Sequence, residues 1–130
     1  MSMVLFNISN HPSNGWSNEQ RRDWDEIVDI SFPNIPAQDG MLEVENAACY
    51  IASDVVQSMR NRGIERAFIS LQGDYSFCHV FQQQLNFVLD DSCNRQLDIS
   101  FVFPTSERRV VENEDGTITR TFQFVQWRGL

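Results

Sequence analysis

Three short polar segments each follow a run of hydrophobic residues, and together they hold most of the side chains that could do chemistry. The first segment follows residues 3–8 and offers two hydroxyls, an amide and an imidazole, from Ser9, Ser13, Asn10 and His11. The imidazole could act as a general acid or base, or could donate a hydrogen bond to an anion. The alternative is a plain turn whose side chains hydrogen-bond to its own backbone.

The second segment follows residues 67–71 and leads into a predicted helix; it comprises Gln72, Gly73, Asp74, Tyr75 and Ser76. A glycine lets the backbone approach a ligand closely, and the free N–H groups of a helix's first turn favour phosphate. Asp74 is itself an anion and could cap the helix instead, so a sugar hydroxyl or a base edge would suit it better. The segment fits neither the GxGxxG nor the Walker pattern.

The third segment follows residues 99–103. In it, Thr105 and Ser106 could donate to phosphate oxygens, and a following arginine could hold a phosphate through two parallel hydrogen bonds. Arg108 and Arg109 would point to opposite faces of a strand, so at most one of them faces a common cleft. The alternative is that both are surface residues of a hairpin, paired with nearby glutamates.

The pattern of hydrophobic residues predicts the elements that position these segments. Strands are predicted at residues 3–8, 26–32, 65–71 and 96–103, and helices at residues 18–25, 41–61 and 76–91. We expect Asp39 to cap the second helix and Gly63 to end it. Residues 108–113 and 117–127, joined across Asp115-Gly116, predict a β-hairpin, and residues 104–108 are expected to form the loop before it.

Alternating strands and helices predict one α/β domain over residues 1–130 with a three-layer, Rossmann-like arrangement. We expect a mainly parallel sheet in the order 2-1-3-4, helices on both faces, and a C-terminal β-hairpin that extends or caps the sheet. This order changes direction between the first and third strands, where open α/β sheets bind ligands. The three polar segments should therefore open into one cleft.

Composition excludes several classes of function. The net charge is −8, which disfavours binding to duplex nucleic acid, and no run is long enough to span a membrane. All ten basic residues are arginine, so a Schiff-base or P-loop lysine is impossible here. The three cysteines are odd in number and lack metal-ligand spacing, which favours reduced thiols in the cytoplasm. We expect neither a metal nor a cofactor.

The sequence of residues 5–13, Leu-Phe-Asn-Ile-Ser-Asn-His-Pro-Ser, followed by Trp16, Ser17 and Gln20, resembles the "LNxSNHPS…W" start of a small bacterial family found with CRISPR systems. Further similar segments are residues 27–33, 105–108 and 122–128. The expected architecture is also similar to that of CARF domains, which bind cyclic oligoadenylates across a two-fold dimer interface. Some CARF domains cleave these ligands as ring nucleases.

The resemblance implies a homodimeric sensor of a cyclic oligonucleotide or another nucleotide, or a metal-independent ring nuclease. The segments containing Ser9 and Thr105 match the positions where CARF domains contact ligand. Several ring nucleases use a lysine, which this chain lacks, so cleavage would depend on His11 and Arg108. The competing hypothesis is a non-enzymatic structural or adaptor protein of a defence complex.

Overall fold

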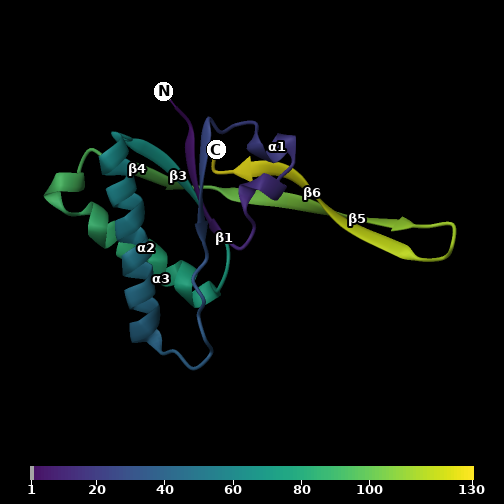
Figure 1. Cartoon of the computed structure of the whole chain (residues 1–130), viewed down its shortest axis with the longest axis horizontal. Coiled ribbons are helices and arrows are strands. Elements are labelled where there is room, and N and C mark those ends of the chain that lie inside the picture. Colours follow the sequence, from purple (N-terminus) through teal and green to yellow (C-terminus); the bar gives the residue numbers. More distant parts are fainter. Residues whose placement is uncertain (1) are drawn as a thin grey trace.

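Strand β1 (Val4–Ser9) runs through the middle of a four-stranded parallel sheet, and all six of its residues are buried. The computed structural model describes residues 2–130. Strands β2 (Glu26–Ser31) and β3 (Arg66–Leu71) flank β1, and β4 (Asp98–Phe101) pairs with β3. The order β2-β1-β3-β4 confirms the predicted topology (Figure 1).

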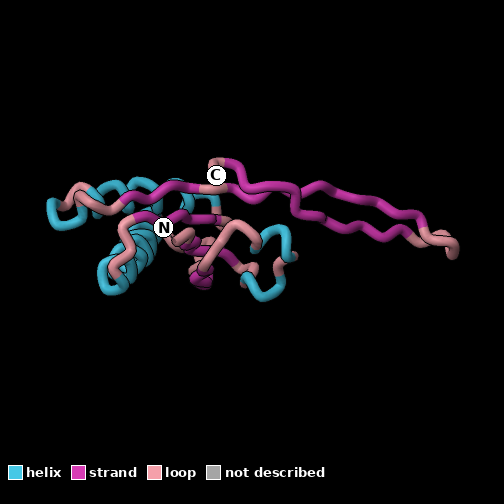
Figure 2. The backbone as a smooth tube through the Cα atoms, turned by 90° about the horizontal axis from the view of Figure 1, so that it is seen from above, coloured by secondary structure: helices cyan, strands magenta, loops and turns pink. Residues whose placement is uncertain are grey.

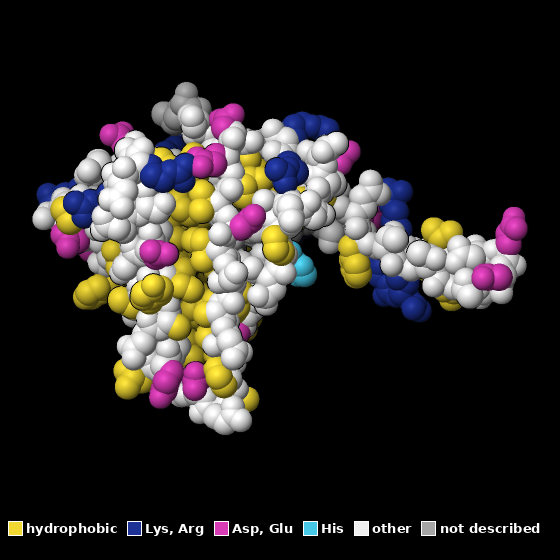
Figure 3. Space-filling model, in the orientation of Figure 1, with side chains coloured by type: hydrophobic (Ala, Val, Ile, Leu, Met, Phe, Trp, Pro, Cys, Tyr) yellow, Lys and Arg dark blue, Asp and Glu magenta, His cyan; other side chains and the backbone are white. Residues whose placement is uncertain are grey.

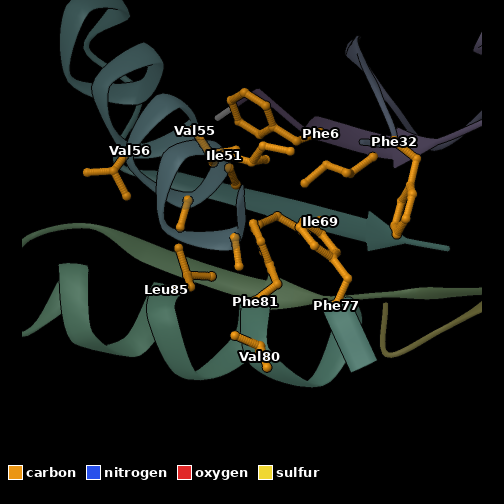
Figure 4. Close-up of a cluster of buried hydrophobic side chains, with 14 of the residues drawn as sticks. Phe6, Phe32, Ile51, Val55, Val56, Ile69, Phe77, Val80, Phe81 and Leu85 are labelled. Carbon is orange, nitrogen blue, oxygen red and sulfur yellow. The ribbon is translucent and has the colours of Figure 1, made fainter. Parts of the chain in front are cut away.

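The two long helices cover one face of this sheet. The helices are α1 (Asn18–Arg21), α2 (Met41–Arg62) and α3 (Tyr75–Leu89), with 3₁₀ turns at Ser13–Gly15 and Ser92–Asn94. Alternate residues of a strand point to one face, so Phe6 of β1 and Ile69 of β3 meet the apolar sides of α2 and α3 (Figure 4). This is the larger of two hydrophobic clusters.

The opposite face carries the smaller cluster, formed by Leu5, Phe68, Trp24, Val102 and Trp127. Helix α1 is a single turn, so indole rings supply most of the cover. The Trp24 ring lies 5.4 Å from the rings of both Phe68 and Trp127. Trp127 Nε1 donates to the carbonyl of Gln20, 2.9 Å away, and thereby ties the C-terminal strand to α1. The expectation of helices on both faces is therefore wrong for the long helices, which both lie on the first face; beside the second face there is, within residues 2–130, only the single turn α1, in contact with β6.

The C-terminal strands β5 (Phe103–Glu112) and β6 (Ile118–Arg128) form a separate antiparallel sheet rather than extending the first. The base of this hairpin covers the second face of the body, and its remainder projects far from it (Figures 1 and 2). We call residues 106–124 the arm. The prediction of a loop at residues 104–108 is wrong, because Thr105, Ser106 and Arg108 lie inside β5. Pro104 is tolerated because both strands of a two-stranded ribbon are edge strands.

A β-bulge sets the direction of the arm's side chains. Thr105 pairs with Gln126, but Ser106 pairs with Phe124, which leaves Val125 as an extra residue on β6. An extra residue shifts the alternation by one. Phe122 and Phe124 therefore lie on the same side as Trp127, and the Phe124 and Trp127 rings are 5.6 Å apart.

The prediction of the residue that caps the N-terminus of α2 is wrong, whereas the prediction for its C-terminus is confirmed. Gly40, not Asp39, is the N-cap, and its N–H donates to the Glu43 carboxylate at 3.0 Å. A carboxylate in the first turn satisfies a free donor and suits the helix dipole, so no cap from Asp39 is needed. At the other end Gly63 adopts a left-handed conformation with φ of 67°, as predicted for a C-terminal glycine.

Candidate functional site

The loop after β1 is held by polar side chains from two strands, the buried Asn7 of β1 and the exposed Asp29 of β2. Asn7 Nδ2 donates to the carbonyl of His11 at 3.0 Å and to the Asp29 carboxylate at 2.9 Å. Asp29 also accepts the N–H of Ser13 at 3.1 Å and its hydroxyl at 2.8 Å. A buried polar group needs such partners, and here they fix the backbone on both sides of Pro12.

Ser9 and Ser13 belong to this support rather than to an open surface. The Ser9 hydroxyl donates to Asn7 Oδ1 at 2.9 Å and accepts the N–H of His11 at 3.1 Å. Both serines are buried, and neither lines the neighbouring cavity. Of the residues predicted in this segment, Asn10 and His11 are exposed and line the cavity. The serines thus position the loop that presents His11.

A cavity of about 560 Å³ opens where the loop after β1 meets the end of β3 and the base of the hairpin. It lies beside the point where the strand order reverses, between β1 and β3. Its lining residues are Asn10, His11, Pro12, Asn14, Gly15, Trp16, Gln20, Ser70, Gln72, Pro104, Thr105, Ser106, Phe122 and Phe124. Members of all three polar segments therefore border one space.

The lining is aromatic and neutral-polar. Trp16, Phe122 and Phe124 supply rings, and the amides come from Asn10, Asn14, Gln20 and Gln72. Ser70, Thr105 and Ser106 supply hydroxyls, and the His11 imidazole is the one acid–base group among the described lining residues. With no carboxylate or guanidinium in this lining, the cavity suits a flat, neutral, hydrogen-bonding group better than an isolated phosphate.

Gly73 and Asp74 lie at a second, shallower hollow, which they share with Asn10 and with the segment from Phe32 to Ile35. A Cβ on Gly73 would stand 2.3 Å from the Phe32 ring, which itself packs on Phe77 at 4.9 Å. Glycine is therefore required at this position because the Phe32 ring occupies the space that a Cβ would need. A role in phosphate binding is not needed to explain it.

Asp74 is the N-cap of α3. Its carboxylate accepts the Ser76 hydroxyl at 2.6 Å and the N–H of Phe77 at 2.9 Å. These two hydrogen bonds, the hydroxyl's first, hold the pKa of Asp74 below its usual value. Tyr75 is 90 % exposed and is not among the residues that line the cavity. Asp74 and Ser76 thus satisfy each other, as the capping alternative predicted.

Arg108 lies on the arm and does not line the cavity. It pairs across the ribbon with Phe122 and shares the side that carries Ser106. Arg109 lies on the reverse side, 3.7 Å from the Glu107 carboxylate. Only Arg108 of this pair is therefore placed near the mouth of the cavity.

Sequence reasoning missed several residues of the site. Asn7 and Ser70 carry a detectable signal, because each is a polar residue directly between apolar residues of a buried strand segment. Asp29 gave no such signal, since its partners Asn7 and Ser13 are distant in sequence. Trp16 and Gln20 enter the site through the fold of the short α1 region, which spacing alone does not predict.

Within residues 2–130, no three histidine, cysteine or acidic side chains gather closely enough to hold a metal ion. None of the helices in this range combines the length and the apolar character needed to cross a membrane.

A family model described as "Uncharacterized protein MJ1673 family" matches residues 3–128. No curated protein matches the chain. The family description contains no reference to CRISPR systems or CARF domains, so that part of the resemblance stays a hypothesis.

Proposed function

The chain belongs to the Uncharacterized protein MJ1673 family, and we propose that it is a cytoplasmic nucleotide-binding protein whose ligand is of the cyclic oligoadenylate type. One observation carries the proposal: the cavity at the strand-order reversal combines three aromatic rings, four amides and one imidazole. Its volume of about 560 Å³ is that of a small-molecule site.

The lining chemistry matches a nucleobase. Asparagine and glutamine amides offer one donor and one acceptor side by side, which pairs with the N6 and N7 edge of adenine. The rings of Trp16 and Phe122 can stack on a base, and such stacking is worth about 1–3 kcal/mol per base. The neutral lining leaves the phosphates to the mouth, where Arg108 stands on the adjoining arm.

Several cavity residues lie in the segments that carry the resemblance to CRISPR-associated proteins and CARF domains. They include Asn10, His11, Thr105 and Ser106. This coincidence supports a defence-system sensor over an unrelated binding protein. The rival function is a structural or adaptor protein of a defence complex, for which the cavity would bind no nucleotide.

A ring-opening reaction is a narrower form of the same proposal. A ribose 2′-hydroxyl would attack the adjacent phosphorus, the bond to the 5′-oxygen would break, and a 2′,3′-cyclic phosphate would form. His11 would accept the hydroxyl proton, the departing 5′-oxygen would take a proton from the His11 imidazolium or from water, and Arg108 would stabilise the charge that develops on the phosphate oxygens. His11→Ala should then abolish turnover while binding persists, and cleavage at the parent's rate would exclude this assignment.

Isothermal titration calorimetry with cyclic tri-, tetra- and hexa-adenylate tests the binding proposal. Trp16→Ala and Gln72→Ala should each weaken binding by about 5- to 100-fold, from the loss of stacking or of a base contact. Tyr75→Ala is the matched control, because this ring is exposed outside the cavity. Absence of heat with all three ligands, or an equal loss in the control, would refute the proposal.

A further inference from the structure

The two sides of the arm differ in character. One side, which we call the Phe122 side, carries Phe122, Val110 and Ile118, which are 74 %, 56 % and 53 % exposed. Arg108, Arg120 and Glu112 lie on the same side, with Glu112 directly opposite Ile118. This side continues directly from the cavity, because Phe122 and Ser106 also line it.

The reverse side is more polar. It carries Thr119, Thr121 and Gln123, and its Arg109 is already paired with Glu107. One hydrophobic residue, Val111, lies on this side. A ribbon exposed to water on both sides is expected to have similar residues on each side. The gathering of Phe122, Arg108 and Arg120 on one side therefore indicates that this side contacts another molecule.

A two-stranded ribbon is at best marginally stable in water when nothing packs on it. The arm makes its hydrogen bonds internally, and its large apolar side chains are exposed along its length. Exposed apolar side chains gathered on one side mark a surface that another molecule covers. The arm is therefore expected to pack on another molecule, and the charges of the arm indicate what type of surface that molecule presents.

Charge is divided unequally between the body and the Phe122 side of the arm. Residues 1–102 contain 14 acidic and 6 arginine side chains, and the whole arm contains four acidic and three arginine side chains. Glu114 and Asp115 belong to the arm's tip and Glu107 is paired with Arg109 on the reverse side, so the Phe122 side has two arginines and one carboxylate, Glu112. Figure 3 shows basic side chains around the middle of the arm and acidic ones at its tip. The arm's middle thus complements an acidic surface with exposed apolar groups.

The body of the same protein offers such a surface on α2. Leu42 and Tyr50 are exposed there, beside the exposed carboxylates of Glu45 and Asp54. Direct stacking of two arms is less favourable, because it would bring Arg108 and Arg120 of both copies together. An arm lying on the partner's body avoids that repulsion.

We propose that the Phe122 side of the arm packs on the outer face of α2 in a second copy of this chain, reciprocally, in a two-fold dimer. The contact is self-complementary, as a two-fold interface must be. Because Phe122 also lines the cavity, the partner would stand at the cavity mouth. The inference goes beyond nucleotide binding and holds or fails without it.

Sedimentation of the full chain over a range of concentrations tests this inference. The parent should be a dimer whose dissociation constant rises with salt, because the arginines face acidic side chains. Val110→Asp should raise that constant by about tenfold or more, whereas Val111→Asp, one residue along on the reverse side, should leave it nearly unchanged. Tyr50→Ser on the accepting helix should weaken the dimer as Val110→Asp does.

Thermal unfolding of each variant shows whether the body still folds. If Val110→Asp fails to fold, Ile118→Ser replaces it, because Ile118 lies on the same side of the arm and its substitution should also raise the dissociation constant. A parent that stays monomeric at high concentration would overturn the inference. Equal effects of the substitutions at positions 110 and 111 on the dissociation constant would overturn it too, as would a dissociation constant that Tyr50→Ser leaves unchanged. Binding of the full-length parent to lipid vesicles, without dimerisation, would assign the surface to a different partner and also overturn the inference.

Discussion

The Asp29 carboxylate accepts both the main-chain N–H and the hydroxyl of Ser13, at 3.1 and 2.8 Å. One edge strand of the sheet thereby fixes the loop that presents His11 to the cavity. The chemistry proposed for the cavity depends on this connection, although Asp29 itself does not line the cavity.

Asp29→Ala should lower the free energy of unfolding by about 1.5–3 kcal/mol, because it removes hydrogen bonds to a charged group and leaves Asn7 without one partner. It should also weaken ligand binding through the loosened loop. Urea unfolding measures the first effect and calorimetry the second. Asp23→Ala, at another exposed aspartate, is the control. Equal stability of the two variants would contradict the role given to Asp29.

Gly73→Ala should destabilise the fold by about 1–3 kcal/mol, because the new methyl group would overlap the Phe32 ring, which Phe77 holds in place. Gly15→Ala is the matched control, since a Cβ there meets nothing within 4 Å. Chemical unfolding of both variants provides the comparison. A neutral Gly73→Ala would mean that the Phe32 ring moves aside freely.

The N-cap of α3 gives a prediction about pH. The pKa of Asp74 is lowered in the folded state by its hydrogen bonds to Ser76 and Phe77, so its contribution to stability is present above the usual carboxyl value of 3.8. It is lost as the pH falls through the lower, folded-state value. The parent should therefore exceed Asp74→Ala in stability near neutral pH, and this difference should shrink below a pH of about 4.

Ser76→Ala tests the cause of the lowered pKa of Asp74, because the hydrogen bond from the Ser76 hydroxyl makes the largest contribution to it. In this variant an NMR titration should find the pKa of Asp74 closer to its ordinary value. A difference in stability between parent and Asp74→Ala that stays constant from neutral to acidic pH would argue against the cap.

Two tryptophans of the smaller cluster should respond differently to replacement by phenylalanine. Trp127 Nε1 donates to Gln20, whereas Trp24 Nε1 is buried without a hydrogen-bond partner among residues 2–130. Trp127→Phe should cost about 1 kcal/mol more than Trp24→Phe, because only the former breaks a hydrogen bond. Unfolding in urea measures the difference, and the reverse ranking would contradict the assigned bond.

Local patterns were sufficient to predict the sheet. The alternation of strands and helices fixed the order β2-β1-β3-β4, and Gly63 and the Asp115-Gly116 turn lie where their backbone preferences predict. These features depend on residues close in sequence, or on the general handedness of crossovers.

Features that depend on distant partners were not predictable in this way. Pro104 and the polar residues after it have the composition of a loop, yet β6 pairs with them as a strand. Ser9 and Ser13 have the composition of a binding loop, yet Asn7 and Asp29 occupy their hydroxyls. In each case a tertiary contact decides between two outcomes that are equally compatible with the local sequence.

The extra residue at Val125 constrains how the hairpin can change in length. Adding or removing two residues in each strand beyond it keeps every remaining side chain on its present side, whereas a single residue in each strand reverses the side on which the tip's residues point. Deleting Val125 would turn Phe122 and Phe124 away from the cavity in one step. Insertions and deletions in this hairpin should thus be accepted in even numbers per strand, and the position of Val125 should be occupied in every functional variant.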